Sequence, residues 1–495
     1  MSTKPADAPD AMRDDASAVT QQYAPSVPNF MRLGSVPVNY LQEVETDLLE
    51  PVIFNDGSGT SVDGFIRWQL QSKGFLHSHS KIFLSVKPNS TTSRAMYPPN
   101  VGVGKVIKKA VLKVGNKVLN EISDWDKLHA YHSTKISNEN NKERELYTTG
   151  RCMNLSINRG NGGALGCPAT SLALTVGRDP DLTINSDLTT GATDNKQMPF
   201  AVLEGSAQAE APSYAVDLSD LFPFLKIHQL PLFVMQEPVT IELTLHPPVN
   251  NRLVFLEGGA DVAQVLDQNE VKFCADYIYY GTGDEMESWA NQNKQLDFSF
   301  VDYRAITTTI TDTSIKSDTV RNIGMASRLV TKVITMFNRG ASDTGEDDLL
   351  MDTAAMATKL SDTKKISGPI DYNLRYNDKF EFSTNVRNTA RLFTLLQQAE
   401  GMVFINRSAY SAQGNAFDST QDNTFESLSL KNQLQGEFFF LSTRLSGGRV
   451  GQRGIELHIK ASDGLEHSDV SVMRNYCEYM RSARLENGII SVFNL

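Results

Sequence analysis

Side chains that could carry out chemistry are few and widely spaced in this chain of 495 residues. His77 and His79 lie two residues apart in the segment LHSHS, so they could share one face of a strand and bind a metal ion together. Two ligands do not complete a tetrahedral site, and no further ligand lies near them in the sequence. We therefore expect an ordinary strand end here and no metal site.

Two other segments have the composition of ligand-binding loops without the required spacing. The glycine-rich segment GGRVGQRG, residues 447–454, lacks the GxxxxGKS or GxxxxGKT pattern of a phosphate-binding loop, so a turn between two strands is the better interpretation. Asp343, Asp347 and Asp348 could hold Ca²⁺ in a loop, but the EF-hand pattern is absent and a solvated acidic loop is expected.

The sequence contains no nucleophile elbow, zinc-protease motif or other arrangement with catalytic spacing. We therefore expect no enzyme activity and no catalytic, cofactor-binding or metal-ligating residues. A pair of glycosidase carboxylates stays open as an alternative, because 58 acidic residues offer many candidate pairs.

Four cysteines do not make a disulfide framework, and none belongs to a CxxC pair, so we expect synthesis in a reducing compartment. They are Cys152, Cys167, Cys274 and Cys477. Three glycosylation sequons, at Asn89, Asn154 and Asn406, are interpreted as chance matches, because residues 1–30 carry charges and prolines where an export signal needs an apolar run. No apolar run approaches the ~20 residues of a membrane-spanning helix.

The net charge of −11 argues against a protein that coats nucleic acid, since that role needs clustered basic residues. Five lysines do gather in one segment: Lys105, Lys108, Lys109, Lys113 and Lys117. They could face a genome, but protection of an edge strand is the interpretation we prefer.

The length favours two domains, and short runs of alternating apolar and polar residues predict that both are rich in β-strands. The predicted strands cover residues 65–70, 81–86, 240–245, 271–280, 296–300, 327–337, 436–445 and 454–460. A hairpin is expected to turn at Gly115 and Asn116, where positive φ costs little. Helices are expected after Ser123 and over 385–398, a long loop over 150–200, and an extended or disordered arm over 1–45.

The two halves of the chain repeat one order of elements. Residues 241–245 read IELTL and precede a strand with Tyr277 and Tyr280, whereas residues 455–459 read IELHI and precede a segment with Tyr476 and Tyr479. The repetition indicates a duplicated β-sandwich or jelly roll.

Three stretches resemble double jelly-roll major capsid proteins of double-stranded DNA viruses. They are LSDLFPFLKIHQLPLFVMQEPVTIELTLHPP at 218–248, VKFCADYIYYGTGDEMESWA at 271–290, and the end of the chain from YNLRYNDKF to NGIISVF. Giant-virus members have an arginine where Met286 stands, so the sequence looks closer to polinton-like viruses and virophages.

The resemblance implies a mostly β protein with two tandem eight-stranded jelly rolls and short helices in loops. It divides the chain into an arm (1–45), a first jelly roll (46–284) and a second (285–495). Three copies would form a pseudo-hexagonal capsomer that tiles an icosahedral virion shell, assembled inside the host cell. The implied partners are neighbouring capsomers, penton proteins and minor capsid proteins, without sequence-specific nucleic acid. A β-sandwich that binds or cleaves carbohydrate is the alternative.

Overall fold

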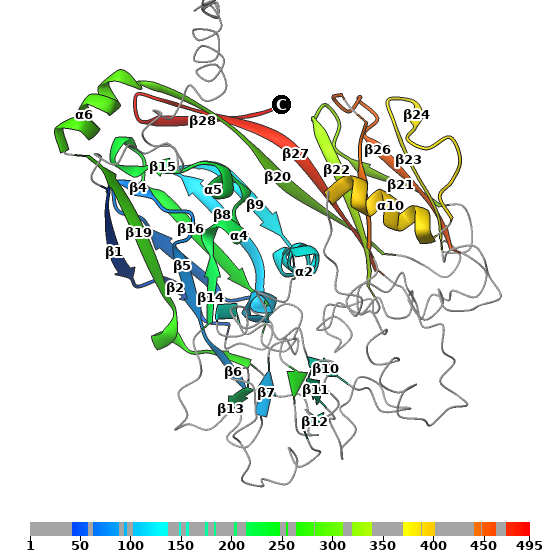
Figure 1. The fold of residues 1–495 in the computed structure, drawn as a ribbon, viewed down its shortest axis with the longest axis horizontal. Coiled ribbons are helices and arrows are strands. Elements are labelled where there is room, and N and C mark those ends of the chain that lie inside the picture. Colours follow the sequence, from blue (N-terminus) through cyan, green and yellow to red (C-terminus); the bar gives the residue numbers. More distant parts are fainter. Residues whose placement is uncertain are drawn as a thin grey trace, which may run out of the picture.

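Two β-sandwiches, each built from antiparallel sheets, form the body of the molecule (Figure 1). The computed structural model describes residues 42–57, 63–88, 94–96, 102–136, 148–149, 155–157, 174–176, 183–184, 202–204, 214–247, 254–255, 264–281, 283–309, 319–338, 370–387, 389–400, 440–446, 448–461 and 472–495. None of the helices within these ranges is long and apolar enough to cross a membrane.

The first sandwich consists of two sheets. In one of them, β19 pairs with β1, β4 and β5, and the other has the strand order β2-β3-β16-β8-β9. The strands of the first sheet are β1 (Gln42–Leu49), β4 (Phe75–Leu76), β5 (Lys81–Leu84), β14 (Tyr214–Asp217), β15 (Leu230–Pro231) and β19 (Lys272–Tyr280). Those of the second are β2 (Val52–Asn55), β3 (Phe65–Gln69), β8 (Ile107–Val114), β9 (Lys117–Ser123) and β16 (Val239–Leu245).

The second sandwich pairs a sheet of order β20-β27-β22-β25, with β28 beside β27, and a sheet of order β21-β26-β23-β24. The strands of the larger sheet are β20 (Gln295–Thr309), β22 (Val330–Asn338), β25 (Phe440–Arg444), β27 (Val472–Glu486) and β28 (Ile489–Asn494). Those of the smaller sheet are β21 (Thr319–Gly324), β23 (Ile370–Tyr376), β24 (Lys379–Phe380) and β26 (Ile455–Ala461).

The repetition expected from the sequence is confirmed by equivalent positions in the two sandwiches. IELTL lies in β16, between β3 and β8, and IELHI lies in β26, between β21 and β23. Likewise, β19 pairs with β1 and β5, whereas β27 pairs with β20 and β22. The chain therefore builds the same arrangement twice.

Short helices connect or cover the sheets. They are α2 (Trp125–Ile136), α4 (Leu218–Leu221), α5 (Pro223–Ile227), α6 (Gly283–Gln292), α10 (Thr389–Glu400), and the 3-10 turns η2 (Gly102–Val106), η7 (Leu232–Val234) and η8 (Gln268–Glu270). Minor sheets contain β6 (Val86–Pro88) with β18 (Gln264–Leu266), β7 (Arg94–Met96) with β13 (Val202–Glu204) and β17 (Val254–Phe255), and β10 (Leu155–Ile157) with β11 (Leu174–Val176) and β12 (Thr183–Ile184). The expected loop over 150–200 thus contains three short strands.

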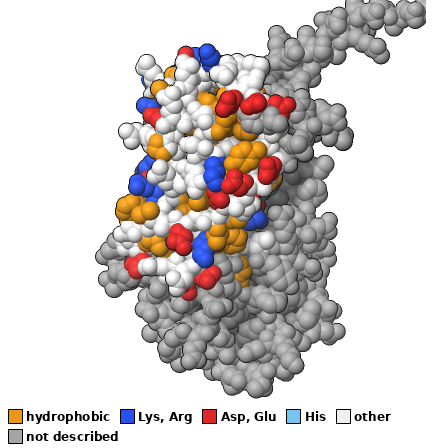
Figure 2. All heavy atoms as spheres, turned by 90° about the vertical axis from the view of Figure 1, so that its left-hand side faces the viewer, with side chains coloured by type: hydrophobic (Ala, Val, Ile, Leu, Met, Phe, Trp, Pro, Cys, Tyr) orange, Lys and Arg blue, Asp and Glu red, His pale blue; other side chains and the backbone are white. Residues whose placement is uncertain are grey.

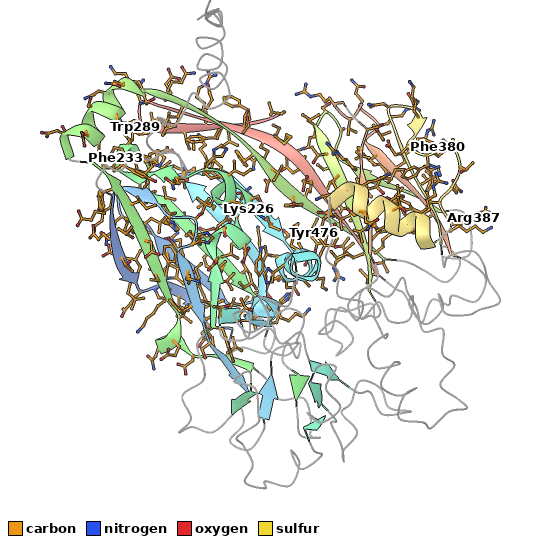
Figure 3. The ribbon with its side chains drawn as sticks, viewed as in Figure 1. Lys226, Phe233, Trp289, Phe380, Arg387 and Tyr476 are labelled. Atoms are coloured by element: carbon orange, nitrogen blue, oxygen red, sulfur yellow. The ribbon has the colours of Figure 1, made fainter. Side chains whose placement is uncertain are left out.

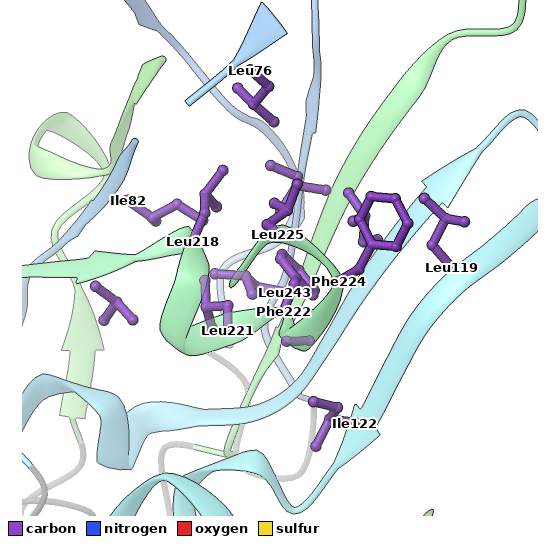
Figure 4. Packing of buried hydrophobic residues seen from close by; sticks show 14 of the residues in the cluster. Leu76, Ile82, Leu119, Ile122, Leu218, Leu221, Phe222, Phe224, Leu225 and Leu243 are labelled. Atoms are coloured by element: carbon purple, nitrogen blue, oxygen red, sulfur yellow. The ribbon is translucent and has the colours of Figure 1, made fainter. Parts of the chain in front are cut away.

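The core of the first sandwich is filled partly by α4 and α5. Figure 4 shows their side chains among strand residues such as Leu76, Ile82 and Leu243. This core continues into residues of β20, β27 and β28, and a separate core lies between the sheets of the second sandwich. Burying these side chains contributes ~25 cal/mol per Å² of apolar surface removed from water.

Three local predictions can be compared with the structure. The hairpin forms as expected, with Gly115 at φ 54° between β8 and β9. The helix expected from Asn385 begins only at Thr389, because Val386 is held extended by reciprocal backbone hydrogen bonds to Tyr372. Strand β1 starts at Gln42, ahead of the expected end of the arm at residue 45, and α6 spans the expected division at 284; the domain limits stay a prediction.

Candidate functional site

The two sandwiches meet along a seam at which β9 and α5 of the first face β20 of the second (Figure 1). Phe224 of α5 packs edge-on against two rings of β20, with centroids 5.5 Å from Phe298 and 5.0 Å from Phe300. Such edge-to-face pairs add to the gain from apolar burial and fix the rings relative to each other. The seam is therefore packed like a domain interior.

A buried ion pair, here called the Asp302 cluster, fixes the register of this seam. Arg481 of β27 donates to Asp302 of β20 at 2.7 Å and to the Leu119 carbonyl of β9 at 2.7 Å. Asp302 also accepts from Asn120 of β9 and Tyr479 of β27, each at 3.1 Å. Burial raises the pKa of Asp302, opposed by the guanidinium of Arg481. The cluster joins both sandwiches through buried polar groups that water does not reach and that form hydrogen bonds within the protein.

A second buried group, the Lys332 cluster, lies further along the seam. Lys332 contacts Glu400 of α10 at 2.8 Å and Glu478 of β27 at 3.0 Å. Tyr303 donates to Glu478 at 2.6 Å, and Tyr131 of α2 donates to Glu400. Burial alone would lower the pKa of Lys332, but the two carboxylates outweigh it and raise that pKa. Helix α2 of the first sandwich is thereby tied to α10 of the second.

Tyr476 shows how little freedom the seam leaves. Its side chain lies between the two sandwiches in Figure 3, and its hydroxyl donates to the Asp124 carbonyl at 2.7 Å. Each hydrogen bond named above requires a particular distance and angle between its donor and acceptor. Together these bonds set the angle between the two sandwiches.

Sequence reasoning did not identify the seam residues. A signal was present, because Leu296, Phe298, Phe300 and Asp302 occupy the same phase of the alternation in β20 and are all buried. An acid in the buried phase of a strand requires a partner, which here is Arg481.

Apolar side chains also lie exposed at the outer edge of the first sandwich. Val44 and Leu48 on β1 and Val52 and Phe54 on β2 are each more than half exposed. Figure 2 shows hydrophobic side chains among acidic and basic ones on the face of the molecule that carries β1. β1 and β2 are the outer strands of their two sheets, and no other strand in the described ranges pairs with the backbone of this edge.

The histidines singled out in the sequence lie close together without further ligands. The rings of His77 and His79 have centroids 5.4 Å apart, and His79 lies 3.5 Å from Asp217. Within the described ranges, no three His, Cys, Asp or Glu side chains are placed to hold a metal ion. Burial is the main cause that lowers the pKa of His77.

Other candidate segments either form turns or lie outside the described residues. The described part of 447–454 connects β25 to β26, and Arg453 pairs there with Asp378 at 2.9 Å. Outside the described residues lie Asp343, Asp347, Asp348, Cys152, Cys167 and the sequon positions Asn89, Asn154 and Asn406.

The lysines of β8 do not protect an edge, so that interpretation is wrong for them, whereas Lys117 lies on β9, the last strand of the sheet. β8 lies between β16 and β9 in its sheet. Lys105 is buried against Asp126 at 3.0 Å, Lys108 pairs with Asp63 at 2.7 Å, and Lys109 and Lys113 pair with Glu121 and Glu242. Four of the five lysines are thus neutralised by carboxylates of the same chain.

Comparisons with known proteins find similar folds and no similar sequences. No family model matches the chain, and no curated protein matches it. Among solved structures, PBCV-1 VP54, fitted into a reconstruction of the virophage Sputnik, is 10% identical with a TM-score of 0.51, covering 91% of this chain and 97% of that one. A chain of the PBCV-1 virus capsid is 11% identical with a TM-score of 0.50 and the same coverage.

The likeness extends over both sandwiches and shows the fold. At this identity it says nothing of individual residues. Together with the duplicated sheet order, it makes the fold a double jelly roll, as expected from the sequence.

Proposed function

We propose that this chain is the major capsid protein of a double-stranded DNA virus and resides in the virion shell. Three copies form a capsomer with a pseudo-hexagonal outline, and these capsomers tile an icosahedral capsid. The observation that carries the proposal is the duplication: two sandwiches of equivalent topology are fixed to each other by a buried seam.

The geometry explains why a duplicated sandwich suits a shell. Each chain presents two similar bodies, so a ring of three chains presents six, and six similar corners pack in a hexagonal lattice. A rigid seam is needed because any change in the angle between the sandwiches would open or strain the ring. The Asp302 and Lys332 clusters supply that rigidity.

The role assigned is structural, without catalysis. The buried carboxylates of the seam accept hydrogen bonds from groups of the protein and serve to orient the sandwiches. The shell would also contain neighbouring capsomers, a separate penton protein at the vertices and minor capsid proteins, and no sequence-specific contact with nucleic acid is proposed.

Negative-stain electron microscopy of the purified protein tests the proposal. The expected result is a uniform particle whose class averages have a hexagonal outline and threefold symmetry. Isolated two-lobed particles, combined with binding to a polysaccharide array, would contradict it and favour a carbohydrate-binding sandwich.

A further inference from the structure

We infer that the outer edge at β1 of one copy docks against the edge at β24 of a second copy, head to tail, as β20 docks against β9 within one chain. This inference rests on the proposed capsid function and assigns its intermolecular contact to particular strands. The occupant of each edge is another copy of the same protein.

The seam within the chain provides the template. β9 is the last strand of the order β2-β3-β16-β8-β9, and β20 is the outer strand beside β27. Across this contact Asn120 of β9 donates to Asp302 of β20 at 3.1 Å. The apolar residues Phe298 and Phe300 of β20 are buried there, with exposed fractions of 3% and 0%.

Because the chain contains the same arrangement twice, each of the two seam strands, β9 and β20, has an equivalent strand that takes no part in the seam. β24 is the last strand of the order β21-β26-β23-β24 and so corresponds to β9, while β1 lies beside β19 as β20 lies beside β27. Their apolar residues are exposed: Leu48 of β1 by 57% and Phe380 of β24 by 51%. Figure 1 places β1 and β24 at opposite sides of the molecule, with the seam between them.

Among the strands that the structure describes, none lies beyond β1 or β24, and these two edges also have complementary charge. The segment QEVETDLLE, residues 42–50, contains four carboxylates and no lysine or arginine. Lys73 pairs with Glu45 at 2.7 Å and with Asp47 at 2.8 Å, which leaves Glu43 and Glu50 as the acidic groups of this edge. The segment RYNDKFEFSTNVRNTAR, residues 375–391, contains four basic residues against two acidic ones. Arg375 pairs with Glu456 at 3.4 Å and Arg387 with Asp371 at 2.8 Å, which leaves Lys379 and Arg391 as the basic groups of this edge. Phe380 and Arg387 both lie on the side of the second sandwich away from the first, with Arg387 below Phe380 in the view of Figure 3. The attraction between the acidic edge at β1 and the basic edge at β24 favours a contact between these two edges over a contact between two β1 edges or two β24 edges.

Because the contact joins two different surfaces, it must either close into a ring or continue as a filament. The seam turns the chain by the angle between its two sandwiches. Repeating an equivalent contact between chains repeats that turn, and the proposed capsomer requires that the ring closes after three copies.

Matched substitutions at exposed strand residues test the assignment. Leu48→Glu and Phe380→Glu each place a carboxylate in the proposed contact, where burying it is costly. Phe493→Glu on β28, where the residue is 50% exposed, is the control. Light scattering after size exclusion should give the wild-type mass for the control and a single-chain mass for both edge variants.

Mixing the two edge variants gives the decisive result. Leu48→Glu retains an intact β24 edge and Phe380→Glu an intact β1 edge, so an equimolar mixture should form a complex of two chains. Variants that keep the wild-type trimer, or a mixture that stays single-chain, would overturn the docking and leave the capsid function standing. A wild-type protein that is itself single-chain would overturn both. Thermal unfolding that matches wild type confirms that each variant is folded.

Discussion

Asp302→Ala should destabilise the protein far more than removal of a surface acid from the same strand. The substitution leaves Arg481, whose side chain is only 13% exposed, without its carboxylate. It also removes the acceptor for Asn120 and Tyr479. Removing one partner of a buried ion pair costs ~3–5 kcal/mol of unfolding free energy. Since Arg481 keeps its bond to the Leu119 carbonyl, we expect the lower end, about 3 kcal/mol.

Asp297→Ala is the matched control, because its ion pair joins the same two strands in an exposed position. Asp297 of β20 pairs with Arg484 of β27 at 2.7 Å, the same distance as Asp302 and Arg481. Its side chain is 57% exposed, so water replaces the lost contact. Its unfolding midpoint should match that of wild type.

Guanidinium chloride titrations followed by circular dichroism measure both effects. The double variant Asp302→Leu/Arg481→Met should recover much of the loss, since it buries no unpaired charge. If Asp302→Ala shifts the midpoint no more than Asp297→Ala does, the reasoning that the Asp302 cluster holds the seam is refuted.

Three further outcomes are expected. Phe224→Ala should lower the unfolding free energy by ~3–5 kcal/mol in the same titration, because it leaves a cavity at the seam; a loss below ~1 kcal/mol would contradict the packing. Burial alone would raise the pKa of Asp126, but Lys105 and nearby groups hold it well below its ordinary value. The resulting stability is present above the unfolded pKa of ~3.9 and is lost as the pH falls through the folded pKa. The unfolding free energy of Asp126→Asn should therefore fall less steeply at acidic pH than that of wild type. Burial raises the pKa of Cys477 to about 12, so its thiol should not react with maleimide in the native protein. Peptide mass spectrometry should find Cys477 labelled only after unfolding, and the partly exposed Cys274 labelled before it.

Strand positions were predictable because alternation is a local property. Ile241, Leu243 and Leu245 face the core of the first sandwich, as their spacing indicated. The repeated IELTL and IELHI segments occupy equivalent central strands, which the order of elements along the chain had suggested.

Features that depend on pairing between distant segments were not predictable. Val386 looks like part of an apolar helix face, but its backbone pairs with Tyr372 and delays the start of α10. The lysines of β8 look like an edge because nothing in the local sequence shows that β16 and β9 flank them. Asp302 could be recognised as buried, but its partner Arg481 lies on another strand.

The mass of the purified protein in solution, measured by light scattering after size exclusion, tests the central claim most directly. We expect a single stable species of three times the 54.7 kDa of one chain, unchanged on dilution. A clean species of 54.7 kDa at high protein concentration would contradict the capsid function and the ring that follows from it.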